Sequence, residues 1–190
     1  MEIYEVTPER LDDLADLFNS NGATRGCWCM YFLIPRKEYG EGRPGGNEQS
    51  FRELTEEGGQ PLGLIAYRDA VPVGWVSAGP RSRYQTAIGP RATVMKGRDP
   101  AEDDDVWLIP CFFVRVGARR SGATRELLQA AVDFALRSGA KAVEGFPLSE
   151  KGKQSADGYL GREHVFTDCG FSVIDRPSDR RVVVRKDLES

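Results

Sequence analysis

The sequence contains little of the chemistry that usually marks a metal-binding or disulfide-rich protein. It has one histidine in 190 residues, and its four cysteines are Cys27, Cys29, Cys111 and Cys169. Their spacing lacks the dense, even pattern of a small disulfide-stapled fold. Structural zinc sites favour a wider spacing than that of Cys27 and Cys29, together with a second pair, and no second pair follows. We therefore expect reduced thiols and no bound metal.

Long apolar runs and an excess of basic charge are also missing. The longest apolar stretch, VWLIPCFFV at 106–114, is well short of the ~18 residues that a membrane span needs. The N-terminal residues MEIYEVTPERLDDL are acidic, unlike the start of a signal peptide. The net charge is −3 and the sequence pI is about 5.4, so no general attraction for nucleic acid or an anionic membrane arises. These absences predict a cytoplasmic protein that binds neither nucleic acid nor membrane.

What is present suffices for one core. A chain of 190 residues that is 40% hydrophobic can bury a sizeable core, and no repeat or linker divides it, so we expect a single domain over residues 1–190. Apolar residues at helical spacing, with caps and stops, predict helices over about 8–19, 48–59 and 122–137, and a short one within 162–170. Asn47 is a candidate N-cap for the second helix. Strands are predicted over 2–6, 61–69, 71–80, 106–114, 141–147, 171–176 and 180–188.

The order of these elements predicts an α+β fold with a mixed sheet. The segments 61–69 and 71–80 are joined so closely that they read as an antiparallel hairpin. The strand, helix, strand order from 106 to 147 requires a crossover, and hence a parallel pair within the otherwise antiparallel sheet. Pro110 cannot donate to a ladder and predicts a bulge. The polar interval 81–105 is typical of either a functional or a disordered loop.

The stretch RVGARRSGATRELLQAA at 115–131 contains four arginines and two glycines around the start of a predicted helix. The first turn of a helix has unpaired N–H groups and the positive end of the macrodipole, so it stabilises an anion. Glycine lets a phosphate approach the backbone, and arginine can bind a phosphate in bidentate fashion. A solvated turn can have the same composition, so this stretch alone leaves both interpretations open.

With the element order, this stretch resembles the GNAT superfamily of N-acetyltransferases. That superfamily carries Arg or Gln, two residues, Gly, one residue, then Gly or Ala at a strand-to-helix junction. The matching positions here run from Arg119 to Thr124, and Thr124 departs from the pattern. HVFTDCGF at 164–171 is similar to the next motif, a short helix ending in Gly-Phe, and PVGWVSAGPRSRY and EGFP look like a bacterial GNAT subgroup whose members mostly lack an assigned substrate. The resemblance extends from residue 2 to about 186 and implies flanking helices and a splayed parallel βαβ unit.

The resemblance also implies acetyl-CoA as the cosubstrate, with no metal. The backbone of Phe112, Phe113 and Val114 would pair with the pantetheine arm. The loop and the first helical turn would hold the pyrophosphate, through Arg119, Arg120, Ser121, Gly122, Ala123 and Thr124. A backbone N–H at the predicted bulge could stabilise the oxyanion formed when an amine attacks the thioester.

Direct attack by an amine requires a deprotonated amine and a proton for the departing thiolate. The superfamily often supplies that proton from a Tyr four residues before the glycine of its Gly-Phe, and that position is Phe166 here. Tyr159 or Tyr84 could replace it, although both could equally be surface aromatics. Glu144, at the end of a predicted parallel strand, is a candidate base or a solvated charge, and many such enzymes use only a water chain.

The remaining candidates concern the acceptor. Cys111 could carry an acyl group as a nucleophile, but the sequence shows no histidine-activated thiol, and a core thiol is the alternative. Trp28 and Met30 follow the first helix, which commonly borders the acceptor pocket in the superfamily. With Arg81 and Tyr84 from the polar interval, they are the predicted acceptor-binding residues.

The function that these features predict is acetyl transfer from acetyl-CoA to a primary amine, carried by a small molecule or a protein. A non-catalytic acyl-CoA-binding sensor is the alternative, because Phe166 and Thr124 depart from the superfamily pattern. A plain protein-interaction module is a third possibility, for which the arginine-rich loop has no role. Dimers are frequent among similar proteins, and a homodimer is compatible with this sequence.

Overall fold

A mixed seven-stranded sheet forms the centre of the computed structural model, which describes residues 1–20, 22–42, 45–152 and 159–189. The strand order is β1-β2-β3-β4-β5-β7-β6, and neighbours are antiparallel except β4 and β5, which are parallel. The strands are β1 (Glu2–Glu5), β2 (Gly63–Arg68), β3 (Val71–Pro80), β4 (Val106–Val114), β5 (Ala142–Gly145), β6 (Ser172–Ser178) and β7 (Arg181–Asp187). The predicted α+β fold, mostly antiparallel with one parallel βαβ unit, is confirmed.

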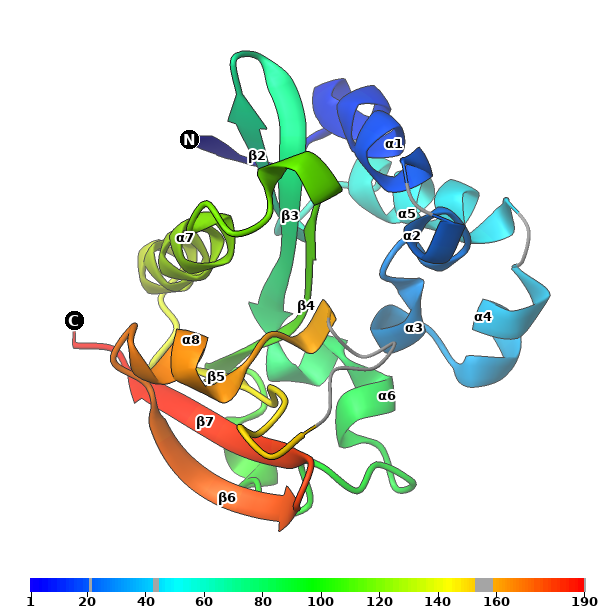
Figure 1. Cartoon of the computed structure of the whole chain (residues 1–190). Coiled ribbons are helices and arrows are strands. Elements are labelled where there is room, and N and C mark those ends of the chain that lie inside the picture. The colour runs from blue at the N-terminus through cyan, green and yellow to red at the C-terminus, as the bar shows by residue number, and fades with distance from the viewer. Residues whose placement is uncertain (21, 43–44, 153–158, 190) are drawn as a thin grey trace.

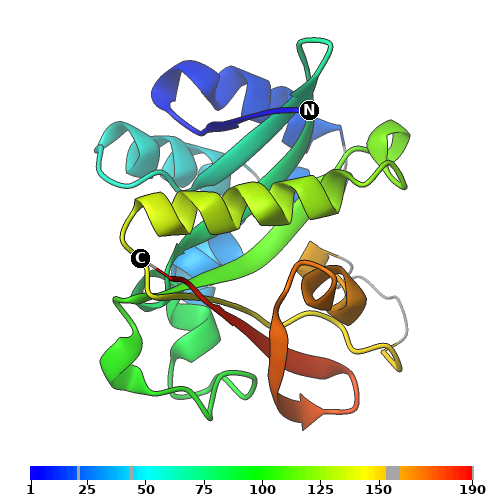
Figure 2. The same cartoon turned by 90° about the vertical axis from the view of Figure 1, so that its left-hand side faces the viewer.

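Helices cover both faces of this sheet (Figure 1). One face carries the helices of the first half of the chain: α1 (Leu11–Asn19), α2 (Gly22–Cys27), α3 (Met30–Leu33), α4 (Arg36–Glu41), α5 (Gly46–Glu56) and α6 (Gln85–Ile88). The other face carries α7 (Ala123–Arg137) and α8 (Glu163–Thr167). Figure 2 shows α7 lying across the strands on its own side of the sheet. We call the first surface the α1 face and the second the α7 face.

The two long helices and the central hairpin form for local reasons. In α7 the predicted stripe Leu128, Ala131, Val132 and Ala135 is buried against the sheet. Between β2 and β3, residues 69–70 both have positive φ, at 52° and 61°, as a two-residue type I′ hairpin turn requires. The residues that determine the helix and the hairpin lie close together in the sequence, which is why the sequence predicts both elements.

The geometry around β4 and β5 positions the candidate site. The two strands pair from Val106–Ala142 to Ile109–Gly145 and no further. Along the β3–β4 pair, Ser77 faces Cys111 but Gly79 faces Leu108, so β4 advances by one residue more than β3. This extra residue is the bulge predicted at Pro110, and it places Cys111 on the α1 face.

Aromatic rings close the α7 face where β4 and β5 part. Phe166 of α8 is fully buried and contacts the ring of Phe112 edge-on, with centroids 5.9 Å apart. An added Cβ on Gly145 would lie 2.7 Å from the Phe166 ring, so glycine is what admits the ring there. The position predicted for a proton-donating tyrosine is therefore a packing residue in this chain.

Two segments differ from the sequence prediction. Asn47 does not cap α5, since the helix begins at Gly46 with Gly45 as its N-cap. Its buried side-chain Nδ2 instead donates to the Gly26 and Tyr39 carbonyls, a use that local sequence does not reveal. The segment 22–41, for which the sequence predicts no regular structure, forms the short helices α2, α3 and α4. Part of the loop between β5 and α8, residues 153–158, lies outside the described residues.

Candidate functional site

The start of α7 presents a row of free backbone N–H groups. Its N-cap, Gly122, has φ 84°, and Arg120 has φ 63°. The amides of Arg125 and Glu126 donate to the Gly122 carbonyl. The amides of residues 120–124 have no hydrogen-bond acceptor within the described part of the chain. Unpaired donors at the positive end of a helix are the kind of backbone arrangement that binds anions in proteins.

This helix terminus is open to solvent. Arg119, Arg120, Ser121 and Gly122 are exposed, and a Cβ added to Gly122 would meet no atom within 4 Å. The Arg119 Nε donates to the Val114 carbonyl at 3.0 Å, which fixes one side of its guanidinium to the end of β4. Arg120 makes no ion pair among the described residues, so its charge remains available to a ligand. The structure thus places the predicted pyrophosphate-binding residues together at an exposed terminus, where the Arg68 guanidinium also donates to the Ser121 hydroxyl at 3.0 Å.

The end of β4 leads from this terminus toward the bulge. The Arg115 amide donates to the Val73 carbonyl, and hydrogen-bonded pairs alternate along an antiparallel ladder. The peptide groups of Phe112 and Val114 therefore point away from β3, toward the side on which β5 is no longer paired. Phe113 belongs to the pairs that face β3, so its backbone is already used. Of the three residues predicted to pair with an extended ligand, Phe112 and Val114 have the suitable orientation.

A buried polar cluster lies beside the bulge on the α1 face. The Cys111 Sγ is 3.3 Å from the Cys29 Sγ, and the Trp75 indole Nε1 donates to the Cys29 Sγ at 3.1 Å. On β3, the Ser77 Oγ is 3.2 Å from the hydroxyl of Tyr84, which is fully buried. Because Ser77 is the β3 partner of Cys111, the Tyr84 phenol lies next to the bulge. Tyr84 was predicted as an acceptor-binding residue, and its burial places it in the protein interior.

Burial also raises the pKa of the Tyr84 phenol. Removal from water raises its pKa to about 12, and Arg83 opposes part of this rise. The phenol therefore carries its proton throughout the neutral range. It does not ionise by itself in that range.

Glu144 and Arg81 belong to a buried ion-pair network. Arg81, which is fully buried, donates from Nη1 to Glu144 at 2.7 Å and from Nε to Asp103 at 2.7 Å. The other Glu144 oxygen accepts from Arg185 at 3.1 Å, and Arg185 also holds Glu102. Both carboxylate oxygens of Glu144 are thus occupied by guanidinium groups, which favours a structural role for it. The network fastens the polar interval 81–105 to β5 and β7.

The other predicted acceptor residues lie in the α1-face core. Met30 is fully buried, and Trp28 packs between Phe18 and Phe51 with ring centroids 5.2 and 5.8 Å away. The Trp28 Nε1 is buried without a hydrogen-bond partner among the described residues. Tyr159 is partly exposed and lies 6.4 Å from the Phe32 ring, between centroids. Trp28, Met30 and Tyr159 lie on the same side of the sheet as Cys111.

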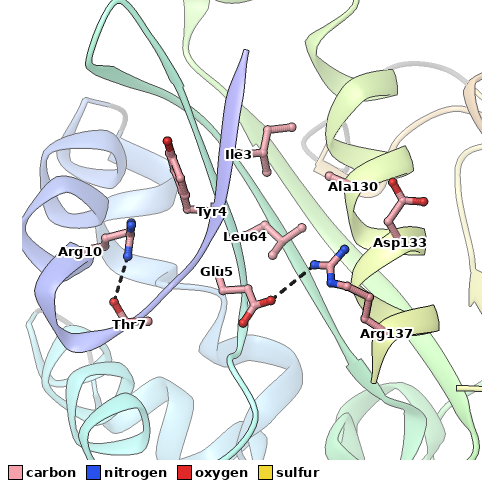
Figure 3. Close-up of a pocket in the computed structure, with 9 residues that line it drawn as sticks. All are labelled: Ile3, Tyr4, Glu5, Thr7, Arg10, Leu64, Ala130, Asp133 and Arg137. Carbon is pink, nitrogen blue, oxygen red and sulfur yellow. Dashed lines mark hydrogen bonds and ion pairs between the residues drawn. The ribbon is translucent and has the colours of Figure 1, made fainter. Parts of the chain in front are cut away.

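A hollow of about 350 Å³ lies elsewhere, between β1 and the C-terminal half of α7 (Figure 3). It is lined by Ile3, Tyr4, Glu5, Thr7, Arg10, Leu64, Ala130, Asp133 and Arg137. An ion pair of 3.4 Å between Arg137 and Glu5 bridges it. It contains none of the predicted site residues and lies beside the opposite end of α7 from Gly122, so it is not part of the candidate site.

Sequence reasoning did not identify Ser77, Cys29 or Arg185 as neighbours of this site. Ser77 reaches it through strand register, while Cys29 and Arg185 lie 82 and 41 residues from the partners that they contact. Of these three residues, only Ser77 could have been placed from the sequence. Side chains alternate between the two faces of a strand, so Ser77 lies on the same face of β3 as Trp75. No local pattern indicates the other two.

Comparison with known proteins gives a consistent result. The family model described as "Acetyltransferase (GNAT) family" matches residues 28–152. No curated protein matches the chain in sequence. Among solved structures, PaiA N-acetyltransferase from Thermoplasma acidophilum, in complex with coenzyme A, is 12% identical with a TM-score of 0.56 and covers 98% of each chain.

Two further solved structures have the same fold. Ribosomal-protein-alanine N-acetyltransferase from Brucella melitensis is 16% identical with a TM-score of 0.58, covering 99% of this chain and all of its own. YncA from Salmonella typhimurium, a putative acetyltransferase with its cofactor acetyl-CoA, is 14% identical with a TM-score of 0.57, covering 99% of this chain and 94% of its own. Within the described residues, no helix has the length and apolarity to span a membrane, and no group of three or more His, Cys, Asp or Glu side chains could hold a metal ion.

Proposed function

Because this chain belongs to the acetyltransferase (GNAT) family, we propose that it transfers an acetyl group from acetyl-CoA to a primary amine by direct attack, in the cytoplasm. The amine would be carried by a small molecule or by a protein. Two of the similar structures contain CoA or acetyl-CoA, which supports the choice of cosubstrate.

The observation that carries the proposal is the open row of amides at residues 120–124. A diphosphate bears several acceptor oxygens and negative charge, and this terminus offers five donors together with the side chains of Arg119 and Arg120. Thr124 adds a hydroxyl in place of the small residue of the family pattern. The residues present therefore fit the diphosphate of CoA.

The backbone of β4 extends this fit toward the reacting end. The peptide groups of Val114 and Phe112 point away from β3, beyond the last pair with β5, where an extended pantetheine arm would exchange hydrogen bonds with the Val114 N–H and the Phe112 peptide; the Val114 carbonyl already accepts from Arg119. The Phe112 N–H lies at the bulge, because Pro110 has no N–H and Cys111 pairs with β3. Phe112 is thus the donor that would stabilise negative charge on the thioester oxygen.

Tyr84 is the proton donor that we propose for the departing thiolate. Its phenol lies beside the bulge on the α1 face, and a pKa of about 12 keeps it protonated at neutral pH. Phe166 has no proton to give, and Glu144 is held by Arg81 and Arg185. The incoming amine would lose its proton to water before attack.

Replacing Tyr84 by phenylalanine is the direct check on that assignment. The expected result is a fall in kcat of roughly 10²-fold with an unchanged KM for acetyl-CoA, since general acid catalysis contributes on that order. Tyr159→Phe is the matched control and should retain activity. Steady-state kinetics that show the large loss in Tyr159→Phe alone would transfer the role to Tyr159.

Ligand binding and turnover test the proposed function itself. Acetyl-CoA at about a hundred times its Kd should raise the Tm by roughly 5–10 °C, as one-site linkage requires for a chain of this size. A panel of primary amines should then include at least one that accelerates release of the CoA thiol. No thermal stabilisation at millimolar acetyl-CoA would reject the proposal.

A non-catalytic acyl-CoA sensor is the second candidate. The observation that favours it is Phe166, a packing residue where the family often has its proton donor. Thermal stabilisation by acetyl-CoA without amine-dependent thiol release across the panel would support the sensor over the enzyme.

A further inference from the structure

Two cysteines from distant parts of the chain meet beside the bulge. Cys29 lies in the turn between α2 and α3, and Cys111 follows Pro110 in β4, 82 residues later. Their sulfur atoms are 3.3 Å apart and both side chains are buried. Cys27 and Cys169 are partly exposed and make no thiol contact of this kind in the described residues.

The turn that brings Cys29 to β4 has an unusual backbone. Trp28 and Cys29 have φ of 47° and 53°, a left-handed conformation that residues other than glycine rarely adopt twice in succession. A strained backbone of this kind persists only where the packing around it holds it in place, and such backbones are enriched at functional sites. Here the Trp28 ring is wedged between Phe18 and Phe51, which holds the Cys29 thiol against the sheet.

The environment of Cys29 suits a thiol that reacts with its neighbour. The contact with Cys111, followed by burial, raises its pKa well above the usual range for cysteine, so it stays a thiol at neutral pH. The Trp75 indole N–H is aimed at its sulfur and is the hydrogen bond that would stabilise a thiolate there. A thiol so placed has few competing partners apart from Cys111.

We propose that Cys29 and Cys111 are a redox-active pair that closes to an intramolecular disulfide in the presence of hydrogen peroxide. The Cys111 sulfur attacks the peroxide and becomes a sulfenic acid, and the peroxide O–O bond breaks to release water. The Cys29 sulfur then attacks the sulfenic sulfur and expels a second water. Two thiols are oxidised by two electrons, one hydrogen peroxide molecule is reduced, and both thiol protons leave in the waters.

This cross-link would tie the α2–α3 turn to β4 at its bulge. On the proposed function, the thioester lies at this bulge, whereas the diphosphate site lies at the far end of β4. Oxidation should therefore lower the rate of acetyl transfer several-fold and leave the affinity for CoA unchanged. The formation of the bond itself does not depend on the proposed function.

The test uses the full chain, reduced and then exposed to hydrogen peroxide, with free thiols blocked by alkylation under denaturing conditions. Peptide mapping without reductant should show the Cys29 and Cys111 peptides joined, with the intact mass lower by two hydrogens. Because the bond closes an 82-residue span, the Tm should rise by about 10 °C and return on reduction. Cys27→Ser and Cys169→Ser should behave like the native chain, and Cys29→Ser should show neither change.

Other outcomes overturn the proposal. Stable oxygen adducts on Cys111 without a joined peptide, joining through Cys27 or Cys169, or two unreacted thiols would each contradict it. Peptide mapping needs no CoA or amine, so a failure of the thiol pair is distinguishable from a failure of the proposed acetyl transfer.

Discussion

Replacing Gly122 by valine is expected to weaken CoA binding at least tenfold in a chain that still folds. Gly122 caps α7 with φ 84°, and the space beside it is empty of protein atoms. A valine there adds a branched side chain where the diphosphate must approach the amides of residues 120–124. Isothermal titration calorimetry with CoA measures the loss, and about tenfold in Kd corresponds to about 1.4 kcal/mol.

The opposite end of the same helix supplies the control. Gly139 has φ 83° and, like Gly122, no atom within 4 Å of an added Cβ. Gly139→Val therefore introduces the same backbone strain in similarly open space, far from the candidate site. Both variants should lose similar unfolding free energy, and only Gly122→Val should lose affinity for CoA. Equal affinities would show that the loop before α7 is not the diphosphate site.

Replacing Arg81 by methionine is expected to cost about 3–5 kcal/mol of unfolding free energy. The Arg81 guanidinium is fully buried and donates hydrogen bonds to the Glu144 carboxylate, the Asp103 carboxylate and the Asp99 carbonyl. Removing it leaves a carboxylate that is 2% exposed with a single cationic partner, Arg185. Since typical domains have only about 5–15 kcal/mol of stability, this single change should be visible as a large shift of the urea midpoint.

An exposed ion pair is the matched comparison. Arg176 donates to Glu163 at 2.7 Å with 59% of its side chain exposed, so Arg176→Met should lower the urea midpoint far less than Arg81→Met does. Equal losses for Arg81→Met and Arg176→Met would contradict the structural role of the buried network.

Glu144→Gln separates the two roles considered for the Glu144 carboxylate, a structural ion pair and a general base. A structural role lowers stability and leaves kcat intact, whereas a base would lose kcat at nearly constant stability.

Local patterns in the sequence predicted the frame of the site. Strand β4 and helix α7 were predicted within one residue of their observed ends, because a continuous apolar run and a clear helical stripe lie within single segments. The bulge followed from one residue, Pro110, whose missing N–H cannot take part in a ladder. The unpaired amides before α7 were also predictable, because the first N–H groups of any helix have no acceptor within the helix, and the sequence places the start of this helix at Gly122.

Contacts between distant segments could not be predicted in the same way. Arg81 meets Glu144 across 63 residues, and Cys29 meets Cys111 across 82. Nothing in the residues around Glu144 shows that two guanidinium groups would surround it, so a solvated charge or a base was an equally reasonable prediction. Tyr84 was judged by its polar neighbours in the sequence, and its full burial arises from tertiary packing. The chemistry of the site thus depends on long-range contacts, and its location depends on short-range ones.

The crystal structure of this chain with CoA tests the central claim most directly. The account predicts that the diphosphate oxygens accept hydrogen bonds from the amides of residues 120–124, and that the pantetheine arm follows β4 past Val114 to Phe112. CoA bound in the hollow between β1 and α7, or a diphosphate held away from the start of α7, would contradict it.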